Sequence, residues 1–161
     1  MEAELRATIL DYLEKHNTLT LATAGDGQPW ATALYYVNDG FNLYILSKPE
    51  TRHCQNLAQN PAVAVTINED YKNWREIKGI QMEGRAYQLS GRGEKARAWA
   101  LYLRKYPFVK DFIMLPRFKE ALESVKLYKI VPTAVWFIDN TKGYFNKQKI
   151  ELNPHSGLTP Q

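Results

Sequence analysis

Three short strand-like runs joined by tight-turn signals constrain the fold of this chain more than any other feature of its sequence. The run TLTLATA, residues 18–24, places Leu19 and Leu21 on one side and threonines on the other, which is the pattern of a half-buried strand. GDGQP then leads to the run WATALYYV, and NDG leads to the run FNLYILS. Because strands that follow one another through such short turns usually pair, residues 18–47 are predicted to form an antiparallel meander.

The rest of the chain adds strands and helices around this meander. Further strand-like runs occupy residues 62–68, 80–90 and 125–139, the last of them interrupted by Pro132. Helical patterns occupy residues 1–17, residues 93–106 and a short segment after Pro116. About six antiparallel strands are most economically arranged as a closed or split barrel with helices packed outside.

The predicted fold is therefore mainly β, in the α+β class: a six-stranded antiparallel split β-barrel with flanking helices. The length of 161 residues suits a single domain with a sizeable core. Within this domain, residues 1–17 form the N-terminal helix, and residues 140–161 form a C-terminal extension that can add an edge strand.

Composition and charge exclude several kinds of protein. The single cysteine, Cys54, excludes a disulfide within the chain and a metal site built on several cysteines. The net charge of +4 comes from dispersed basic residues, so a small anionic ligand balances it as well as a nucleic acid would. No stretch approaches the ~20 apolar residues of a membrane span, and the N-terminus lacks the apolar centre of a signal peptide. A cytoplasmic protein without nucleic-acid or membrane partners is expected.

Groups that bind anions gather where the third strand-like run meets a short helical pattern. This junction holds five of them: Ser47, Lys48, Thr51, Arg52 and His53. A helix N-terminus presents unpaired N–H groups and a partial positive charge, and phosphate binds there readily. Arginine adds a permanent charge with two parallel donors. The junction is therefore a candidate phosphate site, although a capped surface helix has the same residue types.

The same junction carries a family resemblance. The segment LYILSKPETRHCQNLAQNPAVAVTI resembles the phosphate-binding segment of the FMN-binding split-barrel superfamily, which includes pyridoxamine 5'-phosphate oxidase. The resemblance covers residues 18–89, and LYKIVPTAVWFID is similar to the last strand of that family. TRH, IKGIQMEG and DNTKGYFNKQKIEL look closer still to a small, poorly characterised bacterial branch of the superfamily.

The resemblance implies a set of residues that bind FMN. Ser47, Thr51 and Arg52 would bind the FMN phosphate. His53 stands where the oxidase has lysine, so a phosphate dianion would have to hold its imidazole protonated, or Lys48 would substitute.

Two further groups of residues are implied at the flavin ring. The backbone of Thr32, Ala33 and Leu34 would meet the polar edge of the ring. Gln81 resembles a family glutamine, although it lies two residues nearer to the following glycine. Apart from the resemblance, the aromatic surplus and the exposed strand edges of a small barrel favour a homodimer, in which Trp136 or the segment NTKGYF would reach the site of the partner subunit.

The function implied is that of an FMN flavoprotein, in the form of a homodimer with flavin sites at its interface. The expected activity is a flavin-dependent oxidation or reduction, with NAD(P)H as a candidate electron donor. Oxidation of pyridoxamine phosphate is not expected, because NTKGYFNKQKIEL stands in place of the oxidase's C-terminal substrate motif. The alternatives are a non-catalytic flavin carrier or sensor, a haem-binding or haem-degrading barrel, and a basic nucleic-acid module.

Overall fold

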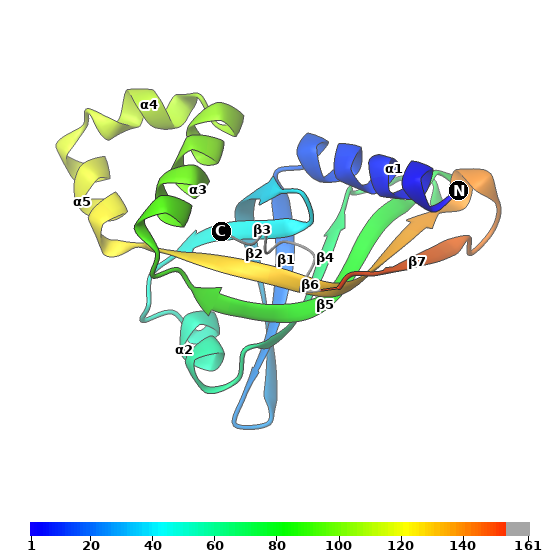
Figure 1. The fold of residues 1–161 in the computed structure, drawn as a ribbon, viewed down its shortest axis with the longest axis horizontal. Helices are drawn as coiled ribbons and strands as arrows, with labels where there is room; N and C mark the ends of the chain where they lie inside the picture. The colour runs from blue at the N-terminus through cyan, green and yellow to red at the C-terminus, as the bar shows by residue number, and fades with distance from the viewer. Residues whose placement is uncertain (154–161) are drawn as a thin grey trace, which may run out of the picture.

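The computed structural model describes residues 1–153, with the side chain of Phe112 excepted. Residues 154–161 of the predicted C-terminal extension lie outside this range. Figure 1 shows a barrel of strands with α1 and α3–α5 above it and α2 below it, beside the β1–β2 hairpin. Among the described residues, no helix is both long enough and apolar enough to cross a bilayer.

The strands form one antiparallel sheet that closes on itself. Its order is β3-β2-β1-β4-β5-β6-β7, and an additional pairing of β3 with β6 closes a six-stranded barrel. The six-stranded barrel is therefore confirmed, and β7 is the edge strand predicted in the C-terminal extension. The bounds are β1 Thr18–Gly25, β2 Gln28–Asp39, β3 Asn42–Ser47, β4 Ala62–Asn68, β5 Lys78–Gln88, β6 Lys126–Asp139 and β7 Lys147–Glu151.

The helices agree with the sequence patterns, with one addition. The predicted helices correspond to α1 Glu2–Lys15, α2 Arg52–Gln59, α3 Arg92–Lys105 and α5 Pro116–Ser124. The addition is the short helix α4, Phe108–Ile113, and two 3-10 turns lie at η1 Trp74–Glu76 and η2 Asn140–Lys142. Ile9 and Leu13 of α1 are fully buried in the main core, so this helix closes part of the barrel.

The predicted interruption at Pro132 is wrong, because β6 runs continuously from Lys126 to Asp139. The register between β5 and β6 shifts at Glu83/Gly84, which leaves Pro132 beside a bulge. A Cβ atom on Gly84 would lie 2.3 Å from the carbonyl oxygen of Val131. The bulge and the glycine together accommodate the proline within a paired strand.

The barrel is split along β2. Its second half, Tyr36–Asp39, pairs with β3, whereas its first half pairs only with β1. No strand among the described residues covers the other edge of β2 from Gln28 to Tyr35. This open edge is the main irregularity of the barrel wall.

Helix α3 docks beside the split through tyrosine hydroxyls. Tyr102 Oη lies 2.9 Å from the carbonyl oxygen of Tyr44 and 3.3 Å from that of Tyr35. Tyr106 Oη lies 2.6 Å from the carbonyl oxygen of Tyr36. The hydroxyls therefore satisfy strand carbonyls and place an aromatic surface next to the open edge.

Candidate functional site

A hydroxyl–imidazole cluster joins the end of β3 to the start of α2. Ser47 is the last residue of β3 and is buried, as is His53 in the first turn of α2. Ser47 Oγ and His53 Nε2 are 2.6 Å apart. Thr51 Oγ1 lies 3.3 Å from Ser47 Oγ and 3.2 Å from His53 Nε2. The predicted gathering of these three side chains is present.

Helix α2 begins after Thr51, as expected, but this threonine does not cap it. Thr51 has the extended backbone of an N-cap residue, while its hydroxyl donates to the carbonyl oxygen of Lys48 at 2.8 Å. No side chain caps the helix, so the first-turn N–H groups are available to an anion. The start of α2 therefore keeps the partial positive charge that the sequence predicted.

The two cations of the junction lie at its surface. Arg52 and Lys48 are both exposed, whereas Ser47 and His53 lie beneath them. The guanidinium carbon of Arg52 is 4.4 Å from the centroid of the Trp30 ring. An anion arriving from solvent therefore meets Arg52, Lys48 and Thr51 before the buried pair.

Cys54 belongs to the same cluster. Burial raises the pKa of the Cys54 thiol, but hydrogen bonds with His53, Thr51 and Tyr128 favour the thiolate, and the balance lowers the pKa to about 7. Burial and the contact with Cys54 raise the pKa of Tyr128. Tyr128 therefore keeps its proton at neutral pH and can donate it in a hydrogen bond to the sulfur.

The open edge of β2 lies beside this cluster. The two-residue turn at Asp26 and Gly27 has positive φ at both positions, which makes Gly25 and Gln28 a hydrogen-bonded pair. Alternation from that pair directs the backbone groups of Thr32 and Leu34 toward β1 and those of Ala33 toward the open edge. Of the three predicted residues, only Ala33 therefore offers free backbone groups there.

An apolar pocket of about 370 Å³ lies against this edge. Ala33, Leu34 and Leu46 form one side of it, and Tyr102 and Phe108 belong to the helical side. None of its lining residues is charged. The apolar pocket and the cluster at Ser47 and His53 lie along the same strand edge, because Ala33 lines the pocket and Trp30, three residues earlier on β2, contacts Arg52. Such an arrangement suits a flat apolar ring that carries a phosphate.

Gln81 and Trp136 are not part of this cluster. They face each other across β5 and β6, and the Nζ atoms of Lys149 and Lys147 lie 4.9 Å and 5.6 Å from the centroid of the Trp136 ring. Ser47 pairs with Lys126, and Trp136 lies ten residues further along β6, roughly 30 Å by the rise of a strand. Within one chain, these residues lie far from the cluster at Ser47 and His53.

Trp30 and the aromatic side chains of α3 belong to the candidate site, although the sequence alone does not single them out. Trp30 opens a strand-like run, and Tyr102 lies in an amphipathic helix, so both have ordinary local patterns. The surplus of aromatic residues was the one available signal, because tyrosine and tryptophan suit pockets with a wet side.

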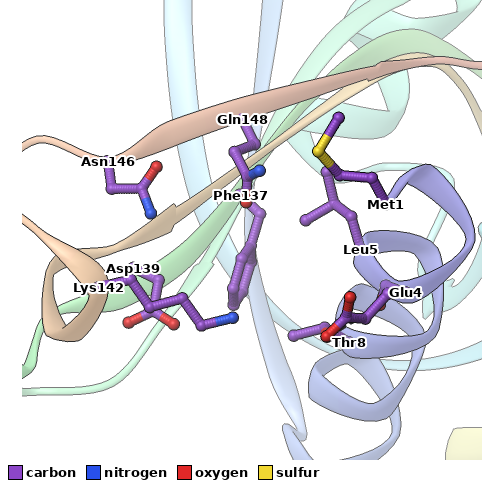
Figure 2. Close-up of a pocket in the computed structure, with 9 residues that line it drawn as sticks. All are labelled: Met1, Glu4, Leu5, Thr8, Phe137, Asp139, Lys142, Asn146 and Gln148. Carbon is purple, nitrogen blue, oxygen red and sulfur yellow. Dashed lines mark hydrogen bonds between the residues drawn. The ribbon is translucent and has the colours of Figure 1, made fainter.

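A second, more polar pocket of about 150 Å³ lies at the other end of β6. Figure 2 shows that α1 contributes Glu4 and Thr8 to it, and that Asp139 and Lys142 face them from the opposite side. Asp139 is already engaged, because its Oδ1 accepts hydrogen bonds from Thr141. None of the predicted site residues lines this pocket.

Comparison with known proteins agrees with the predicted family and fold. The family model of pyridoxamine 5'-phosphate oxidase matches residues 5–139. The chain belongs to this family. Within the pyridoxamine 5'-phosphate oxidase family, it is 30% identical over 146 residues to a UPF0306 protein of Klebsiella pneumoniae (strain 342), covering 89% of this chain and 91% of that protein. It is 32% identical over 146 residues to UPF0306 protein Ent638_3591 of Enterobacter sp. (strain 638), covering 89% and 94%. The predicted likeness to a small bacterial branch is thus confirmed.

Solved structures share the fold. A putative pyridoxamine 5'-phosphate oxidase of Listeria innocua has a TM-score of 0.66 at 24% identity, covering 84% of this chain and 98% of that one. A heme binding protein of Mycobacterium smegmatis has a TM-score of 0.71 at 22% identity, covering 94% and 58%. HutZ of Vibrio cholerae, a heme storage protein, has a TM-score of 0.64 at 21% identity, covering 78% and 88%. At these identities the likeness concerns the fold alone.

Proposed function

We propose that this chain is an FMN-binding flavoprotein that catalyses electron transfer at the open edge of β2. The observation that carries the proposal is the adjacency of two different surfaces. One is the uncapped helix start with Thr51 and Arg52, and the other is the uncharged pocket beside Ala33. FMN needs both surfaces, because it joins a dianionic phosphate to a flat, largely apolar ring.

The donor set fits a phosphate dianion. Arg52 and Lys48 supply two positive charges, and the first turn of α2 supplies backbone N–H groups. The hydroxyl of Thr51 can turn from the carbonyl of Lys48 toward a stronger acceptor. Ser47 and His53 lie behind Thr51 and orient it through their hydrogen bonds. The exposed carboxylate of Glu50, in the same loop, offsets one of these charges, although none of the hydrogen bonds within the cluster involves a carboxylate.

The residues at the split would orient the flavin ring and keep water from it. When bound, FMN supplies the electron-transfer chemistry, which requires no acid–base pair from the protein. The backbone of Ala33 would pair with the polar edge of the ring. Leu34, Leu46 and Phe108 would exclude solvent from its apolar part.

The working unit in this proposal is a homodimer. Exposed alanines of β4, Ala62 and Ala64, and the half-buried Ala22 and Ala24 of β1 line a shallow depression of about 660 Å³. The small side chains of this surface would let the backbone of a second copy approach closely. Trp136 is too distant from the flavin site of its own chain, but in the dimer it would reach the flavin of the partner. Light scattering that showed a monomer holding FMN tightly would contradict the dimer.

A direct test combines spectroscopy with a choice of ligands. The purified protein should carry, or take up, a flavin with its two visible absorption bands. FMN should bind much more tightly than riboflavin, which has the same ring without the phosphate. Equal affinities would remove the phosphate site from the account.

The electron donor is tested separately. In the absence of oxygen, NADPH or NADH should bleach the visible band of bound FMN if a nicotinamide nucleotide is the donor. Normal photoreduction without bleaching by either nucleotide would instead favour a flavin carrier or sensor.

Haem binding is the second candidate, because solved relatives of the same fold bind or store heme. The described residues include His16 and His53, and both Nε2 atoms are engaged. His16 Nε2 lies 2.7 Å from Glu69, and His53 Nε2 lies 2.6 Å from Ser47. Either imidazole would have to break a hydrogen bond to coordinate iron through Nε2. A Soret band on addition of haem, without flavin binding, would favour this alternative.

A further inference from the structure

We propose that Trp30 is a positioning residue that holds the guanidinium of Arg52 ready for a phosphate group. This inference rests on the proposed function and extends it to a residue of the β1–β2 hairpin. The guanidinium carbon of Arg52 lies 4.4 Å from the centroid of the Trp30 ring, within the range of a cation–π contact. Both residues are exposed, so the contact is made on the surface that a ligand would approach.

The contact is one of two side-chain contacts between the β1–β2 hairpin and α2. Thr23 and Trp30 are direct partners in the β1–β2 ladder and therefore lie on the same face. Arg52 and Asn56 are four residues apart in α2 and likewise share a face. The Nδ2 atom of Asn56 donates to Thr23 Oγ1 at 3.0 Å, and both residues are buried. The second contact, on the same two faces, is that of Trp30 with Arg52.

Gly25 permits the close approach that this arrangement requires. A Cβ atom at position 25 would lie 2.2 Å from the Oδ1 atom of Asn56. A side chain at residue 25 would therefore displace the Asn56 amide that donates to Thr23. The buried hydrogen bond between Thr23 and Asn56 fixes the distance between the hairpin and α2. As a result, the exposed Trp30 lies over Arg52.

Stacking leaves the donors of Arg52 free. A guanidinium meets an aromatic ring with its flat face, while its five N–H groups point outward in its own plane. Trp30 can thus restrict the rotamers of Arg52 without occupying the edge that binds phosphate. Because less side-chain freedom is lost on binding, the restriction should strengthen the phosphate contact.

The test compares FMN with riboflavin in a double-mutant cycle. Trp30→Ala should weaken FMN binding about 2- to 5-fold and leave riboflavin binding nearly unchanged, since the stacking energy acts through the phosphate contact. In an Arg52→Ala background, Trp30→Ala should cause no further loss of FMN affinity. Trp30→Phe, which keeps an aromatic face, should retain much of the preference for FMN.

Trp74 is the matched control. It is also exposed, at 52% against 40% for Trp30, and the guanidinium carbon of Arg75 lies 5.6 Å from its ring centroid. Trp74→Ala should leave both affinities unchanged.

Equal losses of FMN and riboflavin in Trp30→Ala, or an undiminished loss in the Arg52→Ala background, would overturn the positioning role. A wild-type protein that did not prefer FMN to riboflavin would overturn the proposed phosphate site, and the role of Trp30 with it.

Discussion

Ser47 Oγ and His53 Nε2, 2.6 Å apart, tie the end of β3 to the first turn of α2. Ser47 also lies opposite Lys126 of β6, so this one hydrogen bond connects the strand pairing that closes the barrel to the helix start that would bind phosphate. The barrel wall is therefore connected directly to the proposed anion site.

Removal of this hydroxyl should destabilise the fold. Ser47→Ala leaves a buried imidazole nitrogen without its closest partner, which should lower the free energy of unfolding by about 1–3 kcal/mol. Urea denaturation measures the change. Ser90→Ala, at an exposed serine after β5, is the matched control and should be neutral. A neutral Ser47→Ala would mean that the hydrogen bond contributes nothing to stability.

Two glycine substitutions should have opposite effects. Gly25→Ala drives a methyl group into Asn56 and should cost about 1–3 kcal/mol of stability. Gly93→Ala, in the first turn of α3 with nothing within 4 Å of the added Cβ, should gain about 0.5–1 kcal/mol. Thermal and urea unfolding of both variants check the signs. If Gly25→Ala were as stable as wild type, the hairpin would not be pressed against α2.

Much of the architecture could be predicted from the sequence, because it follows from local patterns. The alternation of Leu19 and Leu21 indicates a strand, and the tight turns at Gly27 and Gly40 indicate a meander. The start of α2 at Arg52 was also predictable from its residue types.

The remaining features depend on contacts between distant segments. Pro132 resembles a strand break until the bulge opposite Gly84 is known. Trp30 meets Arg52 only after β1, β2 and α2 have packed, and no spacing in the sequence reports that contact. The separation of Trp136 from Ser47 likewise depends on the register of β6.

The cysteine offers a prediction about pH. Cys54 is the only thiol in the chain, so its thiolate absorbance in the ultraviolet should titrate with a pKa of about 7. Because its pKa is lower in the folded chain than in the unfolded chain, ionisation stabilises the fold above the unfolded pKa. That contribution is lost as the pH falls through about 7.

Phosphate should shift this titration. A bound dianion near Cys54 disfavours a second negative charge, so FMN should raise the thiol pKa and riboflavin should raise it less. A pKa at the ordinary value of about 8.5 in the free protein would contradict the hydrogen-bonded cluster. Cys54→Ser, which has no thiol, is the spectroscopic blank.

The ring side of the site can be blocked without touching the phosphate side. Ala33 is exposed and lines the apolar pocket, so Ala33→Trp should fill the pocket with little effect on stability. FMN and riboflavin should then lose affinity together, by about tenfold or more. Ala121→Trp, at an exposed position of α5, should change neither affinity. A selective loss of FMN in Ala33→Trp would place the phosphate, rather than the ring, at β2.

The affinity of Arg52→Ala for FMN and for riboflavin decides whether the start of α2 binds the FMN phosphate. A charged hydrogen bond to an anion contributes roughly 1.5–3 kcal/mol, so the variant should bind FMN about 10- to 100-fold more weakly than wild type. Riboflavin affinity should hardly change, and Arg75→Ala, at an exposed arginine of η1, should bind both ligands normally. Titration calorimetry on the three proteins gives all six dissociation constants. Equal weakening of FMN and riboflavin in Arg52→Ala would contradict the phosphate site and leave α2 as an ordinary surface helix.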